Sequence, residues 1–295
     1  MADEVAASEL ELLVDAHASV GEGPVWSVDE QALYWVDIIG DAVHRYDPAT
    51  GADRAWNVGQ SVGAIGLRQG HPSSLLLALR DGFGTLDLGS GKVELRTPVE
   101  AENGANRLND GKPDPRGRFW AGTMGYNSEP ELGTFYRLDP DWSVTPQFSG
   151  VSISNGLDWT VDERTMYYID SPTQSVDAFD FDANQGRIAG RRSVFQIPRS
   201  VGLPDGMTLD GEGYLWVSLF GVGAVNRYAP DGRLDRVVHV PASQTTCCAF
   251  GGANLDELYI TSAARGLSAS AEPNAGGLYR YRAGVKGRPP NTFAG

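Results

Sequence analysis

The feature that most constrains the fold of this sequence is a unit that occurs six times along the chain. The six segments run near residues 20–56, 62–98, 109–145, 154–195, 204–240 and 247–282. In each segment, a turn with glycine or aspartate precedes a short strand rich in aromatic and β-branched residues, and a second strand with alternating polarity follows. Repeats of about 40 to 50 residues with about four strands are typical of β-propeller blades.

Six repeats predict an all-β fold, a six-bladed β-propeller that occupies residues 1–295 as one domain. The stretch at residues 4–14, with Leu10, Leu12 and Val14, is compatible with a strand face or with a helical turn. In a closed ring, an N-terminal strand that pairs into the last blade beside residues 278–282 protects the sheet edges. We therefore predict that the N-terminal strand closes the ring.

Four repeats begin with an acid or amide residue close to a glycine. These residues are Glu22, Asn109, Asn155 and Asp205. Aspartates follow Glu22 and Asn155 at the same intervals of 7 and 15 residues, and an aspartate and a tryptophan follow Asn109 and Asp205 after 5 and 11 residues. Equivalent residues in a ring of repeats face the same axis, so these side chains should converge. A ring of oxygen ligands predicts a cation site.

The charge of the chain argues against some classes of partner. The net charge is −14, and the acids are scattered along the chain rather than grouped. This composition is unfavourable for nucleic acids and anionic membranes, and it suits cations and neutral or cationic substrates. No apolar stretch approaches the roughly 20 residues of a membrane span. We expect a small-molecule substrate, and the sequence leaves monomer and dimer open.

The cysteines and the N-terminal residues indicate the cellular compartment in which the protein is expected. Cys247 and Cys248 are the only cysteines, and adjacent cysteines are poorly placed for an ordinary disulfide. The first residues are acidic and lack the charged region and apolar core of a secretory signal. We therefore expect a cytoplasmic protein in which the two thiols are buried as small apolar groups.

Two short motifs imitate functional sites. Residues 59–63 match the G-x-S-x-G nucleophile pattern around Ser61, but a strand-like stretch follows where that motif needs a helix. Asp180, Asp182 and Asn184 imitate the start of an EF-hand loop, but Gln185 stands where glycine is required. We expect a blade strand after the first motif and a hairpin turn at the second.

Several longer stretches carry a resemblance to a known family. They are G-E-G-P-V-W at 21–26, N-R-L-N-D-G-K at 106–112, A-G-T-M at 121–124, S-N-G-L-D-W at 154–159, Y-Y-I-D-S at 167–171, P-D-G-M at 204–207, T-T-C-C-A-F-G-G at 245–252 and G-V-K-G-R-P-P-N-T-F-A-G at 284–295. With these motifs the chain resembles the gluconolactonase family, which includes senescence marker protein and the luciferin-regenerating enzymes. The family fold is a six-bladed propeller, in agreement with the repeat count.

The resemblance implies a metal site and a catalytic residue. By position in the motifs, the metal ligands are Glu22, Asn155 and Asp205. Two carboxylates and one amide carbonyl are hard oxygen ligands, suited to one divalent cation such as Ca²⁺, Mg²⁺ or Mn²⁺, with Zn²⁺ tolerated. Three protein ligands leave open positions for water and substrate, as in catalytic sites. Asp205 is also placed to take a proton from the attacking water.

The resemblance also implies substrate contacts. Arg107 and Asn109 match family residues that contact the substrate, and Asp110 matches an acid near the site. The chain departs from the family at Asn127, where the stretch after A-G-T-M reads G-Y-N-S-E-P-E and family members have acidic residues over the cavity. This loop is expected to shape substrate specificity.

The activity that follows is that of a hydrolase acting on carboxylic ester bonds, a gluconolactonase. We predict a metal-dependent sugar lactonase that opens an aldono-1,5-lactone to the aldonic acid. Two alternatives remain open. One is a metal-dependent hydrolase of another electrophile, such as an organophosphate, an aryl ester or a luciferin-type product. The other is a calcium-binding regulatory protein without essential catalysis.

Overall fold

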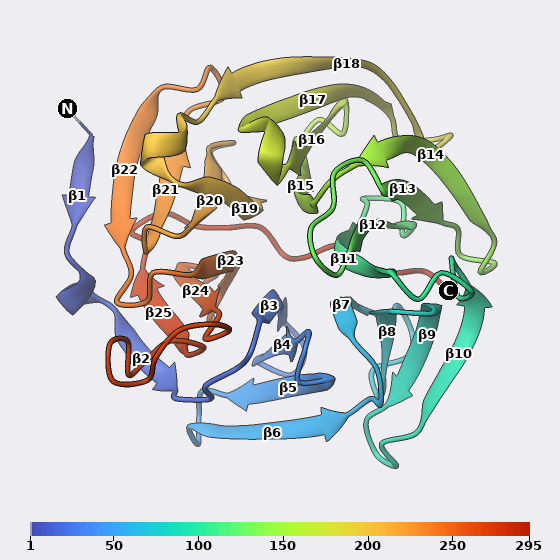
Figure 1. Ribbon diagram of the computed structural model, residues 1–295, viewed down its shortest axis with the longest axis horizontal. Helices are drawn as coiled ribbons and strands as arrows, with labels where there is room; N and C mark the ends of the chain where they lie inside the picture. Colours follow the sequence, from blue (N-terminus) through green and yellow to red (C-terminus); the bar gives the residue numbers. More distant parts are fainter. Residues whose placement is uncertain (1) are drawn as a thin grey trace.

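Residues 2–295, described by a computed structural model, form six β-sheets arranged in a ring around one central axis (Figure 1). Each sheet is one blade, with β3, β7, β11, β15, β19 and β23 as the innermost strands and the strands that follow them in sequence placed successively toward the rim. The strands that follow one another within a blade pair antiparallel. The predicted all-β, six-bladed propeller is confirmed.

The strands follow the predicted repeats closely. Blades one to three are β3 (Gly21–Ser27), β4 (Ala32–Asp37), β5 (Ala42–Asp47) and β6 (Ala52–Asn57); β7 (Val62–Leu67), β8 (Ser74–Leu79), β9 (Gly82–Asp87) and β10 (Val93–Pro98); and β11 (Asn106–Pro113), β12 (Phe119–Gly125), β13 (Gly133–Leu138) and β14 (Val144–Val151). Blades four to six are β15 (Ser154–Trp159), β16 (Thr165–Asp170), β17 (Ser175–Asp182) and β18 (Arg187–Gln196); β19 (Leu203–Leu209), β20 (Leu215–Phe220), β21 (Ala224–Tyr228) and β22 (Leu234–His239); and β23 (Thr245–Gly251), β24 (Glu257–Ser262) and β25 (Leu278–Arg282). The described residues also form three short 3₁₀ helices, η1 (Ala7–Glu9), η2 (Ser171–Thr173) and η3 (Arg199–Val201).

The N-terminal segment closes the ring as predicted. Strand β2 (Glu11–Val14) pairs antiparallel with β25, and it forms the outer strand of blade six. Residues 4–14 are not one strand, however, because η1 interrupts them. Before η1, β1 (Asp3–Val5) pairs in parallel with β22 of blade five. The Glu9 carboxylate accepts a hydrogen bond from the N–H of Ala6, which stabilises the turn that takes the chain from one blade to the next.

The hydrophobic core lies between blades rather than on the axis. Within residues 2–295, six apolar clusters are found, and each joins two neighbouring blades. In the cluster between blades five and six, for example, Trp216 packs with Ile260 and Tyr279. Trp35, Trp120 and Trp216 are fully buried, as predicted for core residues. Side chains at the axis are therefore less constrained by packing and can serve a site.

The matched spacings between repeats come from turns that fix the inner strands. Asp37 accepts hydrogen bonds from the N–H groups of residues 19 and 20, just before β3, and Asp170 does the same for residues 152 and 153, before β15. Asp114 and Asp210 each accept a bond from the indole N–H of the tryptophan six residues later, at 2.9 and 3.0 Å. These acids lock equivalent turns, so the residues that begin the inner strands reach equivalent positions at the axis.

A C-terminal strap, residues 284–295, crosses the end of the axis that is distant in Figure 1. Its backbone accepts a bond at Lys286 from blade five and pairs at Phe293 with blade two, and its Asn291 side chain donates to the carbonyl of Pro113 in blade three. The strap therefore covers the ends of the inner strands on that side and ties several blades together.

The two imitation motifs are structural, as predicted. Ser61 lies directly before strand β7, so no nucleophile elbow forms. Asp182 accepts backbone hydrogen bonds from residues 184 and 185 within the hairpin between β17 and β18. In the part of the chain that the structure describes, no helix is long and apolar enough to cross a membrane.

Candidate active site

The structure brings most of the predicted site residues to one end of the axis. Glu22 lies on β3, Asn155 on β15 and Asp205 on β19, each near the beginning of an inner strand. Asn109 and Asp110 lie on β11. All five side chains are at most 9% exposed. We call this end of the axis, where the inner strands begin, the mouth.

Each inner strand is irregular at the mouth. Within residues 2–295 the pairing of every inner strand with its neighbour shifts register at the level of the predicted site: after Glu22, Val62, Leu108, Asn155, Pro204 and Thr245. Such bulges bend a strand and re-aim its side chains. Here they occur where the strands supply the predicted ligands, so the irregularity positions the site.

The glycines next to the predicted ligands are required by close packing of neighbouring inner strands. A Cβ atom on Gly156 would lie 2.8 Å from the carbonyl oxygen of Asp205. On Gly206 it would lie 2.3 Å from the sulfur of Cys247. The recurring pairing of an acid or amide with glycine therefore has two causes. The acid or amide places a polar group at the axis, and the glycine leaves room for the inner strand of the next blade.

Three buried carboxylates face one another at the mouth. Burial raises the pKa of Glu22 well above its ordinary value, and the charges of Asp205 and Asp110 raise it further. Burial and the charge of Asp110 likewise raise the pKa of Asp205. Burial raises the pKa of Asp110 to about 6, although Lys112 opposes this change. As anions the three groups repel one another in a poorly solvated site.

Two amides and a guanidinium form a connected polar network beside these acids. The Nδ2 group of Asn155 donates to the hydroxyl of Ser171 at 2.8 Å, and its Oδ1 accepts a bond from Asn109 at 3.1 Å. The other Nδ2 bond of Asn109 goes to the carbonyl of Ser154 at 2.7 Å. Arg107 donates to the Oδ1 of Asn109. Both amides are thus oriented by their neighbours, and the carbonyl oxygen of Asn155 points toward Asn109.

This arrangement fits a divalent cation. Glu22 and Asp205 offer carboxylate oxygens, and Asn155 offers an amide oxygen whose orientation is fixed. A cation among them would remove the repulsion between buried acids, and such oxygen ligands suit Ca²⁺, Mg²⁺ or Mn²⁺. No group of three or more His, Cys, Asp or Glu side chains that could hold a metal occurs within residues 2–295. The proposed ligands Glu22, Asn155 and Asp205 include only two such side chains, because the third ligand is the amide of Asn155.

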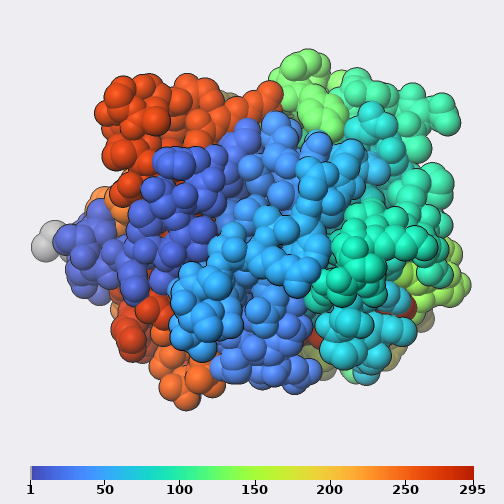
Figure 2. All heavy atoms as spheres, turned by 90° about the horizontal axis from the view of Figure 1, so that it is seen from below, coloured from blue at the N-terminus to red at the C-terminus, as the bar shows by residue number. Residues whose placement is uncertain are grey.

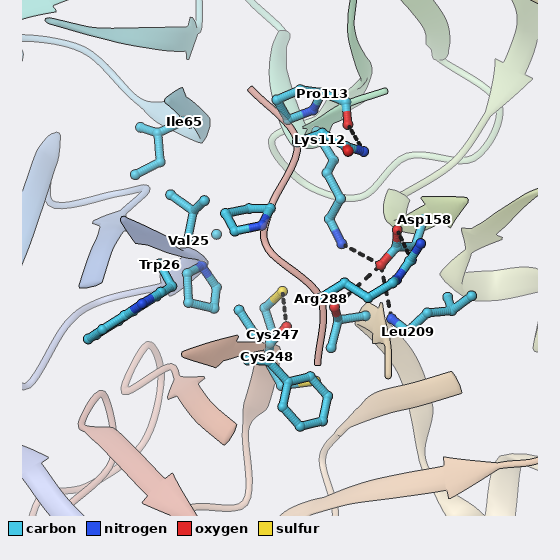
Figure 3. Close-up of a pocket in the computed structure, with 18 of the residues that line it drawn as sticks. Val25, Trp26, Ile65, Lys112, Pro113, Asp158, Leu209, Cys247, Cys248 and Arg288 are labelled. Carbon is cyan, nitrogen blue, oxygen red and sulfur yellow. Dashed lines mark hydrogen bonds and ion pairs between the residues drawn. The ribbon is translucent and has the colours of Figure 1, made fainter. Parts of the chain in front are cut away.

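A small chamber lies on the axis between the mouth and the strap. Its volume is about 80 Å³, and its lining includes Asp110, Lys112, Asp158, Cys247 and Arg288. Figure 3 shows Lys112 and Arg288 pointing toward Asp158, with the strap crossing the view. The Nζ of Lys112 lies 3.4 Å from Asp158, and a guanidinium nitrogen of Arg288 lies 3.3 Å from it. The two cysteines in the wall are buried and are not joined by a disulfide.

The charges around this chamber are balanced. Asp158 also accepts backbone hydrogen bonds from Trp159 at 2.8 Å and Leu209 at 2.9 Å. Burial alone would raise the pKa of Asp158, but Lys112 and Arg288 outweigh it and hold that pKa below its usual value. Asp158 therefore joins blades three, four and five to the strap.

Comparison with known proteins identifies the family. The family model described as the SMP-30/gluconolactonase/LRE-like region matches residues 20–264. The chain belongs to this family. Regucalcin from Gallus gallus is 42% identical to it over 286 residues, which cover 94% of this chain and 95% of that protein. The predicted resemblance is confirmed.

Solved structures of similar proteins agree with the fold. The crystal structure of a calcium-binding protein, regucalcin, from Agrobacterium tumefaciens superposes with a TM-score of 0.94 at 29% identity, over 99% of both chains. A gluconolactonase from Xanthomonas campestris superposes with a TM-score of 0.74 at 25% identity, over 92% of this chain and 88% of that one.

Asn127 is the predicted site residue that stands apart from the others. It is exposed in the loop after β12, where its Nδ2 donates to a carboxylate oxygen of Glu129 at 2.9 Å. The neighbouring Tyr126 donates to the hydroxyl of Ser61 at 2.9 Å, and its ring centre lies 5.9 Å from the guanidinium carbon of Arg107. The loop thus reaches the mouth through Tyr126, and a substrate contact by Asn127 stays a prediction.

Sequence reasoning missed the balanced network of Lys112, Asp158 and Arg288. Each of these residues stands in a motif that carries the family resemblance, but nothing in the sequence pairs them. A charged residue with large apolar neighbours in an inner strand, such as Asp158 between Leu157 and Trp159, is the available signal, since buried charges need partners.

Proposed function

We propose that this protein is a metal-dependent sugar lactonase that hydrolyses an aldono-1,5-lactone to the aldonic acid. The observation that carries the proposal is the set of buried, mutually repelling carboxylates at the mouth, next to an oriented amide oxygen. Membership of a family that includes gluconolactonases supports the reaction class.

Glu22, Asn155 and Asp205 would hold one divalent cation. When bound, the cation supplies polarisation of the lactone carbonyl and lowers the pKa of nearby water. The oxygen ligands suit Ca²⁺, Mn²⁺ and Mg²⁺, with Zn²⁺ tolerated.

The side chains of the protein would transfer the proton and orient the substrate. Water adds to the carbonyl carbon while Asp205 accepts its proton. The bond between the carbonyl carbon and the ring oxygen then breaks, and that oxygen leaves as a hydroxyl group with a proton returned by Asp205. Arg107 and Asn109 would orient the sugar and stabilise the developing negative charge on the carbonyl oxygen. Asp110 and Asn127 complete the proposed substrate surroundings.

A single panel of assays tests this proposal. The protein is freed of metal with a chelator, and hydrolysis of aldonolactones, aryl esters and a fluorophosphate is measured before and after adding each cation. We expect lactone hydrolysis that the chelator abolishes and a divalent cation restores. Lactone hydrolysis that is insensitive to the chelator would contradict the role of the metal.

Two other candidate functions are decided by the same panel. Faster hydrolysis of an ester or a fluorophosphate than of any lactone would favour an enzyme for another electrophile. Tight calcium binding without any hydrolysis would favour a calcium-binding regulatory protein, for which the oxygen-only ligand set is also suited. A cytoplasmic location, a single domain over residues 1–295, and a monomer or dimer remain predictions.

A further inference from the structure

The loop after β12 places an aromatic side chain, Tyr126, at the mouth. Met124 of β12 pairs with Arg107 of β11, and Tyr126 follows two residues later. The N–H of Tyr126 donates to the carbonyl of Ala105 at 2.9 Å, so the pairing of the two strands extends to this residue. Because side chains two residues apart on a strand share a face, Tyr126 lies on the same side of the blade as Arg107. The distance of 5.9 Å from its ring centre to the guanidinium carbon of Arg107 agrees with this placement.

Tyr126 also reaches the neighbouring blade. Its hydroxyl donates to the hydroxyl of Ser61 at 2.9 Å, and Ser61 is buried directly before β7 of blade two. Two residues later, Gly63 packs against β11, because a Cβ atom there would lie 2.7 Å from the Cα atom of Asn109. The side chain of Tyr126 therefore spans from blade three to blade two, across the segment that carries Arg107 and Asn109.

The loop that carries Tyr126 is a compact turn. The N–H of Ser128 donates to the carbonyl of Gly125 at 2.9 Å, and the side chain of Asn127 donates to that of Glu129. In Figure 2 the light green part of blade three rises at the top of the molecule, as does the red loop between β24 and β25. With its backbone tied to β11 and its hydroxyl tied to blade two, Tyr126 holds its ring in a fixed place beside the mouth.

The ring of Tyr126 borders the polar network that the substrate is proposed to contact. Arg107 donates to Asn109, and Asn109 donates to the amide oxygen of Asn155 at 3.1 Å. A lactone that contacts Arg107 and Asn109 therefore lies beside the ring of Tyr126. The proposed ligands and substrate contacts are carboxylates, amides and a guanidinium, so Tyr126 adds an apolar face to a polar site.

We propose that the ring of Tyr126 forms a wall of the substrate site and selects the closed lactone ring over the open-chain acid. This inference rests on the proposed lactonase function and specifies how the site distinguishes substrate from product. The planar ester group flattens a lactone ring, and the C–H groups of that ring form a face that the negative face of an aromatic ring attracts. An open-chain acid has no such face, so it is bound less tightly and leaves after hydrolysis.

Calorimetry with two neutral ligands tests this selection without hydrolysis. The ligands are glucono-1,5-lactam, which keeps a flattened six-membered ring and resists hydrolysis, and gluconamide, its open-chain counterpart with the same kind of carbonyl group. The metal-loaded wild type should bind the lactam about tenfold more tightly. Tyr126→Ala should lower the ratio of the two affinities by about three- to tenfold, the effect of one lost aromatic contact. Equal affinities in the wild type, or an unchanged ratio in Tyr126→Ala, would overturn the inference.

Further variants separate the aromatic ring from the hydroxyl. Tyr126→Leu keeps an apolar side chain without the aromatic ring, and it should lower the ratio as Tyr126→Ala does. Tyr126→Phe and Ser61→Ala lose the contact between the hydroxyls and keep the ring, so each should retain most of the ratio. A ratio in Tyr126→Phe as low as in Tyr126→Ala would show that the ring does not make the selection, and would overturn the inference.

Tyr214→Ala is the matched control. Tyr214 is also half-buried, and the guanidinium carbon of Arg227 lies 3.8 Å from its ring centre. It stands in the turn before β20, which is bonded to the strap at the other end of the axis. This variant should leave the ratio of affinities unchanged. A fall as large as that in Tyr126→Ala would overturn the assignment of the selection to Tyr126.

Kinetics separate this inference from the proposed function. In Tyr126→Ala, KM for glucono-1,5-lactone should rise by about three- to tenfold, while kcat and metal affinity stay within about twofold. A loss of kcat or metal affinity as large as the change in KM would mean that Tyr126 only holds the loop, and would overturn the inference. If the wild type hydrolyses no lactone, the lactonase proposal fails, and the calorimetric ratio still decides the role of Tyr126. If it hydrolyses lactones but the ratio is unchanged in Tyr126→Ala, only the inference fails.

Discussion

Buried charge is handled in opposite ways at the two levels of the propeller axis. At the mouth, Glu22, Asp205 and Asp110 face one another. Burial raises the pKa of all three, and the charges of neighbouring mouth acids raise the pKa of Glu22 and Asp205 further. Nearer the strap, Asp158 lies between Lys112 and Arg288, which hold its pKa low. A protein folds most stably when its buried charges are paired, as at Asp158. The unpaired acids at the mouth are therefore best explained by a ligand that the chain itself does not supply.

The largest effect should come from the mouth acid that is proposed to have two roles. Asp205→Asn keeps the shape of the side chain but loses its charge and basicity. We expect weaker metal binding and a loss of lactone hydrolysis of about 10²–10⁴-fold, as is typical when a positioned base is removed. The matched control is Asp162→Asn, at an exposed turn of blade four, which should retain full activity. Near-normal turnover by Asp205→Asn at saturating metal would show that the site is assigned wrongly.

Asp158, the acid that pairs with Lys112 and Arg288, should affect the stability of the fold rather than catalysis. Asp158→Ala leaves the partly buried side chains of Lys112 and Arg288 without their anion, and breaking a fully buried ion pair in this way costs about 3–5 kcal/mol, which is the upper limit of the loss expected here. The free energy of unfolding, measured in urea, should fall by up to that amount. Replacing all three charged residues with apolar ones of similar size should recover much of the loss. A loss below about 1 kcal/mol for Asp158→Ala would mean that the network does little to hold the blades together.

The amide of Asn109 at the mouth should affect substrate binding more than metal binding. Asn109→Ala removes the group that accepts from Arg107 and donates to Asn155. We expect KM for the lactone to rise by about tenfold, the effect of one lost hydrogen bond to a charged group, while metal affinity stays within a few-fold. Calorimetric titration with the cation, beside the kinetic assay, separates the two effects. A loss of metal affinity as large as that in Asp205→Asn would make Asn109 a ligand.

The smallest predicted effect is an increase in the stability of the metal-free protein, whereas most substitutions lower stability. Glu22→Gln removes one of the repelling charges and keeps the shape of the side chain, so the metal-free protein should become more stable, by about 1 kcal/mol or a few degrees in Tm. Added cation should reverse this order, because the wild type gains stability from binding and the variant gains less. A lower Tm for metal-free Glu22→Gln would mean that the carboxylates at the mouth do not oppose folding.

The fold could be predicted because its causes are local and repeated. Alternating strands, tight turns and an acid or amide beside glycine recur in the blades, and the position of a residue in its repeat determines its place around the axis. The convergence of Glu22, Asn109, Asn155 and Asp205 followed from that geometry alone. The break of the N-terminal strand at η1 was missed, since the pattern of Leu10, Leu12 and Val14 indicates a strand but does not show which blade the residues before it join.

The balanced network could not be predicted because its partners are distant in the sequence. Lys112 and Asp158 are 46 residues apart, and Asp158 and Arg288 are 130 residues apart. They meet only because inner strands of different blades and the strap converge on the axis. Likewise, the sequence gives no sign that Asn127 binds Glu129, because side-chain directions in an exposed loop are not set by a repeating pattern.

The position of a bound cation is the most direct test of the contrast between the two levels. Crystals of the protein soaked with Mn²⁺ would be measured near the manganese absorption edge, where the ion is located by its anomalous scattering. We predict one strong peak on the axis at the mouth, bounded by Glu22, Asn155 and Asp205, that is absent from crystals of Asp205→Asn. A peak beside Asp158, or no peak at the mouth, would contradict this account.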